Sequence, residues 1–116
     1  MKASDTYRVP PFRYNCAQAI AAKYASKYGI SKDEAIARFA TCAAGGAPGG
    51  LCGALYAAQQ ADPANADAAA NTFAAHTGGH LTCRDLKTIA HVPCKTCIDI
   101  ADQILGGDNY ASLGNE

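Results

Sequence analysis

The sequence contains no tryptophan and few large aliphatic side chains, and its charges cancel. Leucine, isoleucine, valine and phenylalanine together supply 18 of 116 residues, and ten basic residues balance ten acidic ones. Disorder is typical of chains that combine few large apolar residues with a high net charge, and this chain is neutral. We therefore expect one folded domain with a thin, alanine-rich core, to which a metal centre could add stability.

Basic runs and long apolar runs are also absent from the sequence. Nucleic acids and anionic membranes are bound by clustered lysine and arginine, so neither is an expected partner. No apolar run approaches the roughly 18 residues of a transmembrane helix. The N-terminal segment lacks the apolar core of a secretory signal. We therefore expect a cytoplasmic protein whose thiols stay reduced.

Strand patterns are nearly absent, whereas helix start and stop signals are frequent. Asn15 is a candidate N-cap, residues 31–34 form a capping box, and paired glycines at 45–46 are expected to stop the second helix. Helices are expected over 16–28, 35–44, 52–61, 64–76, 83–91 and 94–105. The predicted fold class is all-α, a compact bundle of about five to six short helices at 12–106, between an N-terminal arm at 1–11 and a polar, frayed tail at 107–116.

The six cysteines are the most informative residues. Cys16, Cys52, Cys83 and Cys94 each fall at or near an expected helix start, where the positive end of the helix dipole favours the thiolate. Thiolates bind metals and attack disulfides, so this placement suits either chemistry. Cys42 lies in the middle of an expected helix, where a small buried side chain explains it equally well.

Cys94 and Cys97 form a CxxC pair on one face of an expected helix. The pair is either a dithiol redox couple or two ligands of a shared centre. The residue after Cys97 is not histidine, which excludes c-type haem attachment. No Ser–His–acid arrangement, phosphate loop or HExxH motif supports an enzyme that acts on small molecules. The histidines His76, His80 and His91 are expected at the surface or at helix ends.

Four segments together resemble a known family. They are NCAQAI at 15–20, GGLCGALYAA at 49–58, FAAHTGGHLTCRDL at 73–86 and CKTCIDIADQIL at 94–105. In order and spacing they are similar to the bacterial and archaeal C_GCAxxG_C_C family of redox-active proteins, over about residues 12–106. A related four-cysteine domain of split-Soret cytochromes is thought to hold an iron–sulfur cluster. The resemblance implies that cysteines 16, 52, 83 and 94 bind such a cluster here.

The chain departs from the family pattern at three positions. Ala57 stands where the family has glycine, and Cys42 and Cys97 are additional. The extra thiol of Cys97 makes it a substitute for Cys94 as the fourth ligand. Gly49, Gly50 and Gly53 are expected to let backbone amides approach the sulfurs of the centre.

The leading hypothesis is a small electron-transfer or redox-sensing protein that holds a [2Fe–2S] or [4Fe–4S] cluster and works with a redox partner protein. One alternative is a thiol–disulfide redox protein that uses Cys94 and Cys97, with Cys52 or Cys42 as a further partner. Another is a bundle with a structural zinc ion on the same four thiolates. We expect a metal-binding or electron-transfer protein rather than an enzyme. Its alanine-rich helical surface is compatible with a homodimer.

Overall fold

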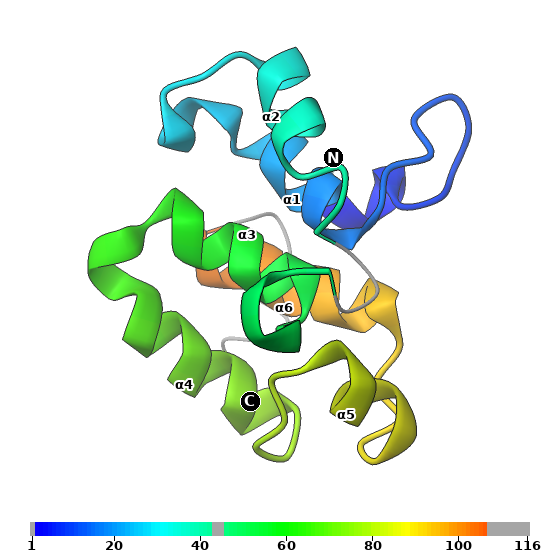
Figure 1. Ribbon diagram of the computed structural model, residues 1–116, viewed down its shortest axis with the longest axis vertical. Coiled ribbons are helices and arrows are strands. Elements are labelled where there is room, and N and C mark those ends of the chain that lie inside the picture. Colours follow the sequence, from blue (N-terminus) through cyan, green and yellow to red (C-terminus); the bar gives the residue numbers. More distant parts are fainter. Residues whose placement is uncertain (1, 43–45, 107–116) are drawn as a thin grey trace.

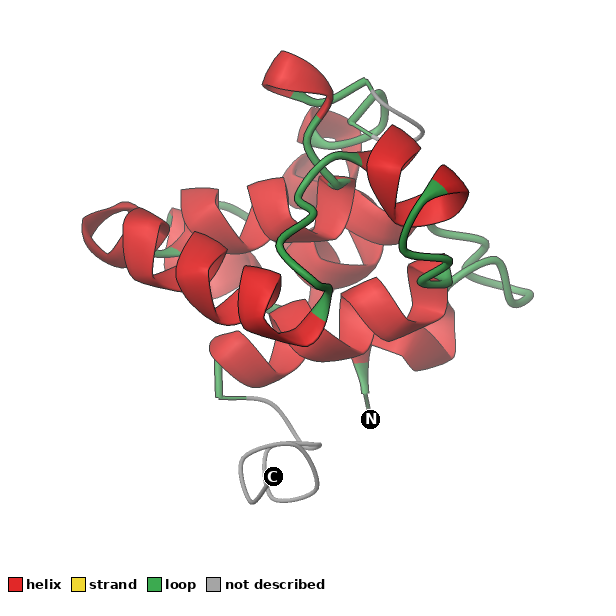
Figure 2. Cartoon of the chain, turned by 90° about the horizontal axis from the view of Figure 1, so that it is seen from below, coloured by secondary structure: helices red, strands yellow, loops and turns green. Residues whose placement is uncertain are grey.

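The computed structural model describes residues 2–42 and 46–106. Its α-helices and 3-10 helices (η) are, in chain order, η1 (Ala3–Thr6), α1 (Cys16–Lys23), η2 (Ala25–Tyr28), α2 (Lys32–Arg38), η3 (Pro48–Gly50), α3 (Gly53–Ala61), η4 (Pro63–Asn65), α4 (Ala66–His76), α5 (Cys83–Thr88) and α6 (Cys94–Ile104). Figure 2 shows helices and loops, and no strand, in this part of the chain. The all-α prediction is confirmed. Of the helices described, none is long and apolar enough to cross a membrane.

Helices α1, α3 and α6 pack against one another at the centre of the bundle. Helix α2 packs on α1, and α4 packs on both α3 and α6 (Figure 1). Alanine supplies much of the buried surface of α1 and α3, and the larger buried side chains include Ile20, Leu55, Phe39, Phe73 and Ile98. Small side chains at a helix contact let the helix axes approach closely. The alanine-rich composition therefore builds a core through close helix contacts.

Helix α2 is shorter than the sequence predicts, and this changes the place of Cys42. The helix ends at Arg38, so Cys42 lies in the loop that follows and the prediction of a mid-helix position is wrong. The side-chain amide of Asn15, the N-cap of α1, donates to the carbonyls of Phe39 and Ala40 at 3.4 and 3.0 Å. It thereby takes acceptors that a continuing helix would use. The glycine pair expected to stop this helix begins at Gly45, which lies outside the described residues.

The N-terminal residues are fastened to the bundle by one buried carboxylate. Asp102 of α6 is fully buried and accepts hydrogen bonds from the Ala3 amide at 2.8 Å and the Lys23 ammonium at 3.1 Å. The hydroxyl of Tyr24 donates to the same carboxylate. Element η1 thereby packs against α1 and α6, which places residues 7–14 beside the start of α1. We call residues 7–14 the arm, in place of the predicted bounds 1–11.

Candidate cysteine site

The cysteines predicted to share a site line one small cavity. Its lining includes Cys16, Cys52, Cys83, Cys94 and Cys97, and the cavity volume is about 10 Å³. Cys16, Cys52 and Cys97 are buried and form its inner wall, whereas Cys83 and Cys94 are half-buried and form its solvent side. All six cysteines of the chain are free thiols. Parts of the chain that are far apart in sequence thus bring five thiols together.

A short backbone bridge holds Cys52 next to Cys83. Leu51 and Thr82, the residues just before the two cysteines, form an isolated antiparallel bridge. The amide of Cys52 donates to the carbonyl of Leu81 at 2.8 Å. The hydroxyl of Thr82 caps α5 by accepting from the amide of Asp85 at 3.2 Å. Helices α3 and α5 therefore start side by side, each with a cysteine at its first turn.

The turn between α5 and α6 brings the CxxC pair over the same cavity. Helix α5 ends at Thr88, three residues before the expected end at 91, because the amide of Val92 folds back to the carbonyl of Leu86 at 2.8 Å. His91 takes a left-handed conformation with φ +54° in this turn. Helix α6 then starts at Cys94. This sharp reversal brings Cys94 and Cys97 of α6 to the cavity that Leu86 and Lys87 of α5 also line.

Gly53 lets α1 and α3 approach closely at the cavity. A Cβ atom on this residue would lie 2.2 Å from the carbonyl oxygen of Cys42 and 2.7 Å from the Sγ of Cys16. The clearance expected of Gly53 is confirmed. Gly49 and Gly50 have nothing within 4 Å of such an atom, and their φ angles of +69° and +73° show that they serve the turn before α3 instead. The expected approach of their amides to the sulfurs of a centre stays a prediction.

A hydrogen bond couples the two buried thiols of Cys52 and Cys97. The bond from Cys97 lowers the pKa of Cys52 to about 7, and the amides of Leu55 and Ala54 at the start of α3 act in the same direction against the cost of burial. The same bond, together with burial, raises the pKa of Cys97 above its usual range. The hydrogen bond therefore favours ionisation of Cys52 and disfavours ionisation of Cys97.

The net shift is opposite at Cys16, where burial outweighs the hydrogen bonds to the sulfur. Burial, followed by the nearby thiols of Cys52 and Cys94, raises the pKa of Cys16 to about 12. The prediction that a helix start favours the thiolate is therefore confirmed at Cys52 and wrong at Cys16. Backbone amides at the helix starts lower the pKa of both Cys52 and Cys16. At Cys16 the desolvation of a buried charge is the larger effect.

The two thiols on the solvent side, Cys83 and Cys94, are called the outer thiols. One is bonded to a cationic side chain and the other to a phenol that is itself bonded to a cationic side chain. The hydroxyl of Tyr7 is hydrogen-bonded to Cys94, and the Nε of Arg8 donates to that hydroxyl at 3.0 Å. Burial and then the bond to Cys94 raise the pKa of Tyr7. Lys87 is hydrogen-bonded to Cys83, and the nearby sulfur raises the pKa of Lys87. These contacts place Lys87 and the Arg8-bonded Tyr7 on the solvent side of the cavity.

Sequence reasoning missed Tyr7, Arg8 and Lys87. The arm returns to the start of α1 through an isolated bridge between Tyr7 and Tyr14, in which the Arg8 amide donates to the Tyr14 carbonyl at 3.0 Å. This closure brings residue 7 to residue 94, a pairing for which no local pattern exists. For Lys87 a signal was available, because it lies four residues after Cys83 on α5 and so shares a helix face with it.

Cys42 and the histidines stand apart from the cavity. The side chain of Cys42 is half-buried and is absent from the cavity lining, which its backbone touches only through the contact with Gly53. None of His76, His80 and His91 lines the cavity. His76 and His91 are exposed and His80 is half-buried. The titratable groups of the site are therefore thiols and their three cationic or phenolic neighbours.

The thiols suit an iron–sulfur cluster by chemistry, and their spacing differs from that of a single-ion site. Within the described residues, no group of three or more His, Cys, Asp or Glu side chains is arranged to hold one metal ion. A zinc site needs four thiolates at about 2.3 Å from the same ion. Iron–sulfur clusters are held by four thiolates, and five are present. The cavity of about 10 Å³ has room for roughly one water, so a cluster would need the lining thiols to move apart.

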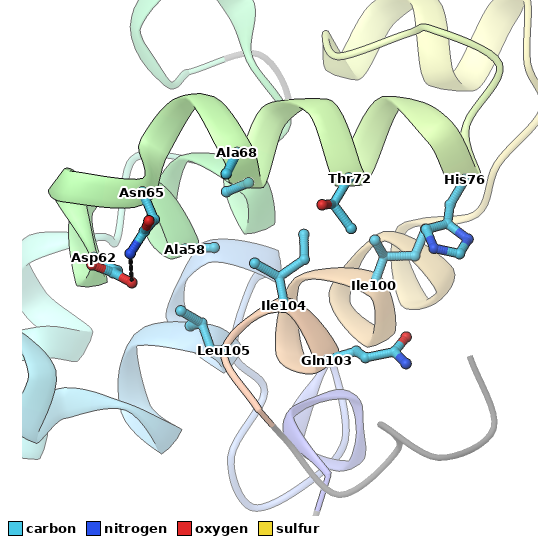
Figure 3. A pocket seen from close by; sticks show the side chains of 11 residues that line it. Ala58, Asp62, Asn65, Ala68, Thr72, His76, Ile100, Gln103, Ile104 and Leu105 are labelled. Atoms are coloured by element: carbon cyan, nitrogen blue, oxygen red, sulfur yellow. Dashed lines mark hydrogen bonds between the residues drawn. The ribbon is translucent and has the colours of Figure 1, made fainter. Parts of the chain in front are cut away.

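A larger cavity lies on another side of α6 and contains no cysteine. Its volume is about 420 Å³, and it lies between α4 and α6 (Figure 3). Ile100, Ile104 and Leu105 form an apolar wall. Asn65 donates to the carboxylate of Asp62 at 2.9 Å at one end of the cavity. The reactive groups of the molecule gather in the smaller cavity.

No family model matches this chain, and neither the search of curated proteins nor the search of solved structures found a match. The resemblance to the C_GCAxxG_C_C family thus stays a prediction from the sequence.

Proposed function

We propose that this chain is a small redox protein whose cysteine site binds an iron–sulfur cluster and serves electron transfer or redox sensing. The observation that carries the proposal is the convergence of five thiols, from four separate parts of the chain, on one cavity. Four cysteine thiolates are the usual ligand set of such clusters. Free thiols in this number also suit a reducing compartment, and we place the protein in the cytoplasm with a redox partner protein.

The ligands that we assign are Cys16, Cys52, Cys83 and Cys94, with Cys97 as the substitute for Cys94. When bound, the cluster supplies one-electron chemistry. Amides of the first turn of α3 already bond to the sulfur of Cys52, and such bonds help to set the potential of a cluster. The inner thiols exclude water, and the outer thiols face the side from which an electron partner can approach.

Anaerobic purification, followed by metal analysis, tests the proposal. We expect visible absorbance together with iron and acid-labile sulfide, because a thiolate-bound cluster contributes all three. Zinc without sulfide would favour the structural zinc site instead. A colourless protein that stays free of iron after reconstitution with iron and sulfide would contradict the proposal. Loss of colour in Cys94→Ser or in Cys97→Ser identifies the fourth ligand.

A second candidate function, thiol–disulfide exchange, is favoured by the hydrogen bond between Cys52 and Cys97. The Cys52 thiolate would attack a substrate disulfide, form a mixed disulfide and release one substrate sulfur as a thiolate. Cys97 would then lose its proton and attack the Cys52 sulfur, which releases the second substrate thiol and leaves a Cys52–Cys97 disulfide. The structure therefore pairs Cys97 with Cys52, whereas the sequence pairs it with Cys94.

Peptide mapping after oxidation tests this second function. The iron-free protein is incubated with oxidised glutathione and the remaining thiols are alkylated. Thiol–disulfide exchange predicts a Cys52–Cys97 disulfide, with Cys42 recovered in alkylated form as the internal control. Recovery of a Cys94–Cys97 disulfide would assign the exchange to the pair predicted from the sequence instead, and recovery of mixed disulfides only would contradict the exchange itself.

A further inference from the structure

The solvent side of the cysteine cavity lies between two basic segments. Residues 7–14 and 83–97 contain five of the ten basic residues of the chain and one of its ten acidic residues. Their net charge is therefore +4, although the whole chain is neutral. The five basic residues, which we call the basic rim, are Arg8, Arg13, Arg84, Lys87 and Lys95. All five are exposed.

Contacts at the cavity bring the two segments together. Arg8 reaches Cys94 through Tyr7, and Lys87 is bonded to Cys83. Lys87 is also close enough to Tyr7 for the two groups to interact electrostatically. In Figure 1 the arm and α5 lie on either side of the first turn of α6. Two members of the basic rim, Arg8 and Lys87, thus lie at the two outer thiols, and the other three belong to the same two segments.

The neighbouring acidic residues do not cancel this charge. Asp85, the one acidic residue within the two segments, is half-buried at the start of α5. Asp99, further along α6, is half-buried and has one carboxylate oxygen enclosed. Asp5 precedes the arm and is bonded to the backbone amide of Lys2. The charges presented to solvent around the outer thiols are therefore predominantly positive.

Exposed apolar side chains accompany the basic rim. Val9 and Ile89 are 46% and 59% exposed, and within the described part of the chain they are the exposed large hydrophobic residues. Val9 follows Arg8 directly, and Ile89 lies two residues after Lys87. Protein interfaces typically combine apolar contacts with a polar, charge-complementary periphery. Phosphate backbones offer no partner for such apolar side chains, so the surface favours a protein over a nucleic acid.

We propose that the basic rim docks an acidic protein that exchanges electrons with the cysteine site. Opposite charges speed the encounter and orient the partner, and the outer thiols then lie under the contact. The electron exchange rests on the proposed redox function, whereas the docking itself does not. Binding can therefore be measured with or without a cluster in the site.

Nuclear magnetic resonance of the ¹⁵N-labelled protein tests the docking surface. The protein is titrated at low salt with an acidic plant-type ferredoxin as the probe, and separately with basic cytochrome c and with duplex DNA. We expect the ferredoxin to shift or broaden amide signals of residues 8–14 and 84–95, and roughly 0.5 M salt to abolish the effect. Changes centred on α2 or α4, no change, or stronger binding of cytochrome c or DNA would overturn the proposal.

A matched pair of double variants makes the test specific. Arg84→Gln with Lys95→Gln removes two exposed rim charges that contact no thiol, and we expect roughly tenfold weaker ferredoxin binding. Lys27→Gln with Arg38→Gln removes two exposed charges from η2 and α2 and should leave binding unchanged. Equal weakening in both would overturn the proposal. Iron loading is measured separately, so a protein that docks but binds no cluster contradicts only the proposed function.

Discussion

Groups from two helices lower the pKa of the Cys52 thiol. Amides at the start of α3 and the thiol of Cys97 in α6 bond to its sulfur, and together they outweigh its burial. With a pKa of about 7, roughly half of this thiol is ionised at neutral pH. The proton that leaves Cys52 is the only one that the buried thiols release readily, because the pKa values of Cys16 and Cys97 are raised.

Replacing Cys97 by alanine should raise the pKa of Cys52. The variant loses the donor that stabilises the thiolate, and burial, which favours the neutral thiol, remains. The measurement is the ultraviolet absorbance of the thiolate, followed against pH in the iron-free protein. We expect a transition near pH 7 in the unsubstituted protein. In Cys97→Ala it should move to pH 8.5 or above, roughly the ordinary cysteine value. Cys42→Ala is the control and should leave the transition in place. An unchanged transition in Cys97→Ala would show that the hydrogen bond does not set this pKa.

At the scale of residues, the sequence identified the cysteines but not their electrostatic states. The helix-start argument succeeds for Cys52, where amides and a second thiol add together. It fails for Cys16, because the degree of burial depends on how α1 and α3 pack, which no local pattern reports. The role of Tyr7 could not be predicted for the same reason, because only tertiary folding brings its partner Cys94 to it.

Elements meet at the cavity through contacts that allow little substitution. Helix α3 can start against α1 only because Gly53 has no side chain. The bridge between Leu51 and Thr82 then fixes the starts of α3 and α5 relative to each other. The sequence predicted these helix starts well, because N-cap residues and glycines are local signals. It predicted the ends of α2 and α5 poorly. Asn15 reaches the end of α2 from another part of the chain, and at α5 the turn that follows folds back through the amide of Val92.

Gly53→Ala tests the close contact between α1 and α3. At an ordinary helix position, this exchange stabilises a protein by up to about 1 kcal/mol. Here the new methyl group would meet the Cys42 carbonyl, so we expect the free energy of unfolding to fall by about 1–3 kcal/mol. Urea denaturation measures the change, and loss of iron binding should accompany it because Cys16 must move. A more stable variant would contradict the close approach.

Across the whole molecule, one carboxylate joins the N-terminal residues to the two helices that flank the site. Asp102 binds the Ala3 amide, Lys23 and Tyr24, and through η1 it sets the start of the arm that carries Tyr7 to Cys94. The division of the chain into an arm and a domain, predicted from composition, did not anticipate this attachment. The residues around Asp102 in the sequence do not indicate that it is buried or that its partners lie near the N-terminus.

Asp102→Ala should destabilise the fold and loosen the arm. Removing one member of a buried, hydrogen-bonded ion pair typically costs about 3 kcal/mol, and Lys23 would lose its carboxylate partner here. Urea denaturation measures the loss, and proteolysis within residues 2–14 should become faster. Asp67→Ala on the exposed surface of α4 is the control, with an expected change below about 1 kcal/mol. Equal effects of the two substitutions would remove the special role of Asp102.

The central claim is that cysteines from four parts of the chain share one centre and that Cys42 does not belong to it. Iron and acid-labile sulfide per chain, counted after anaerobic reconstitution of the six single cysteine-to-serine variants, test this claim most directly. We predict that Cys16→Ser, Cys52→Ser, Cys83→Ser and one of Cys94→Ser and Cys97→Ser lose most of the bound iron, and that Cys42→Ser binds as much as the unsubstituted protein. Full loading of Cys16→Ser, Cys52→Ser or Cys83→Ser, or loss of iron from Cys42→Ser, would contradict the account.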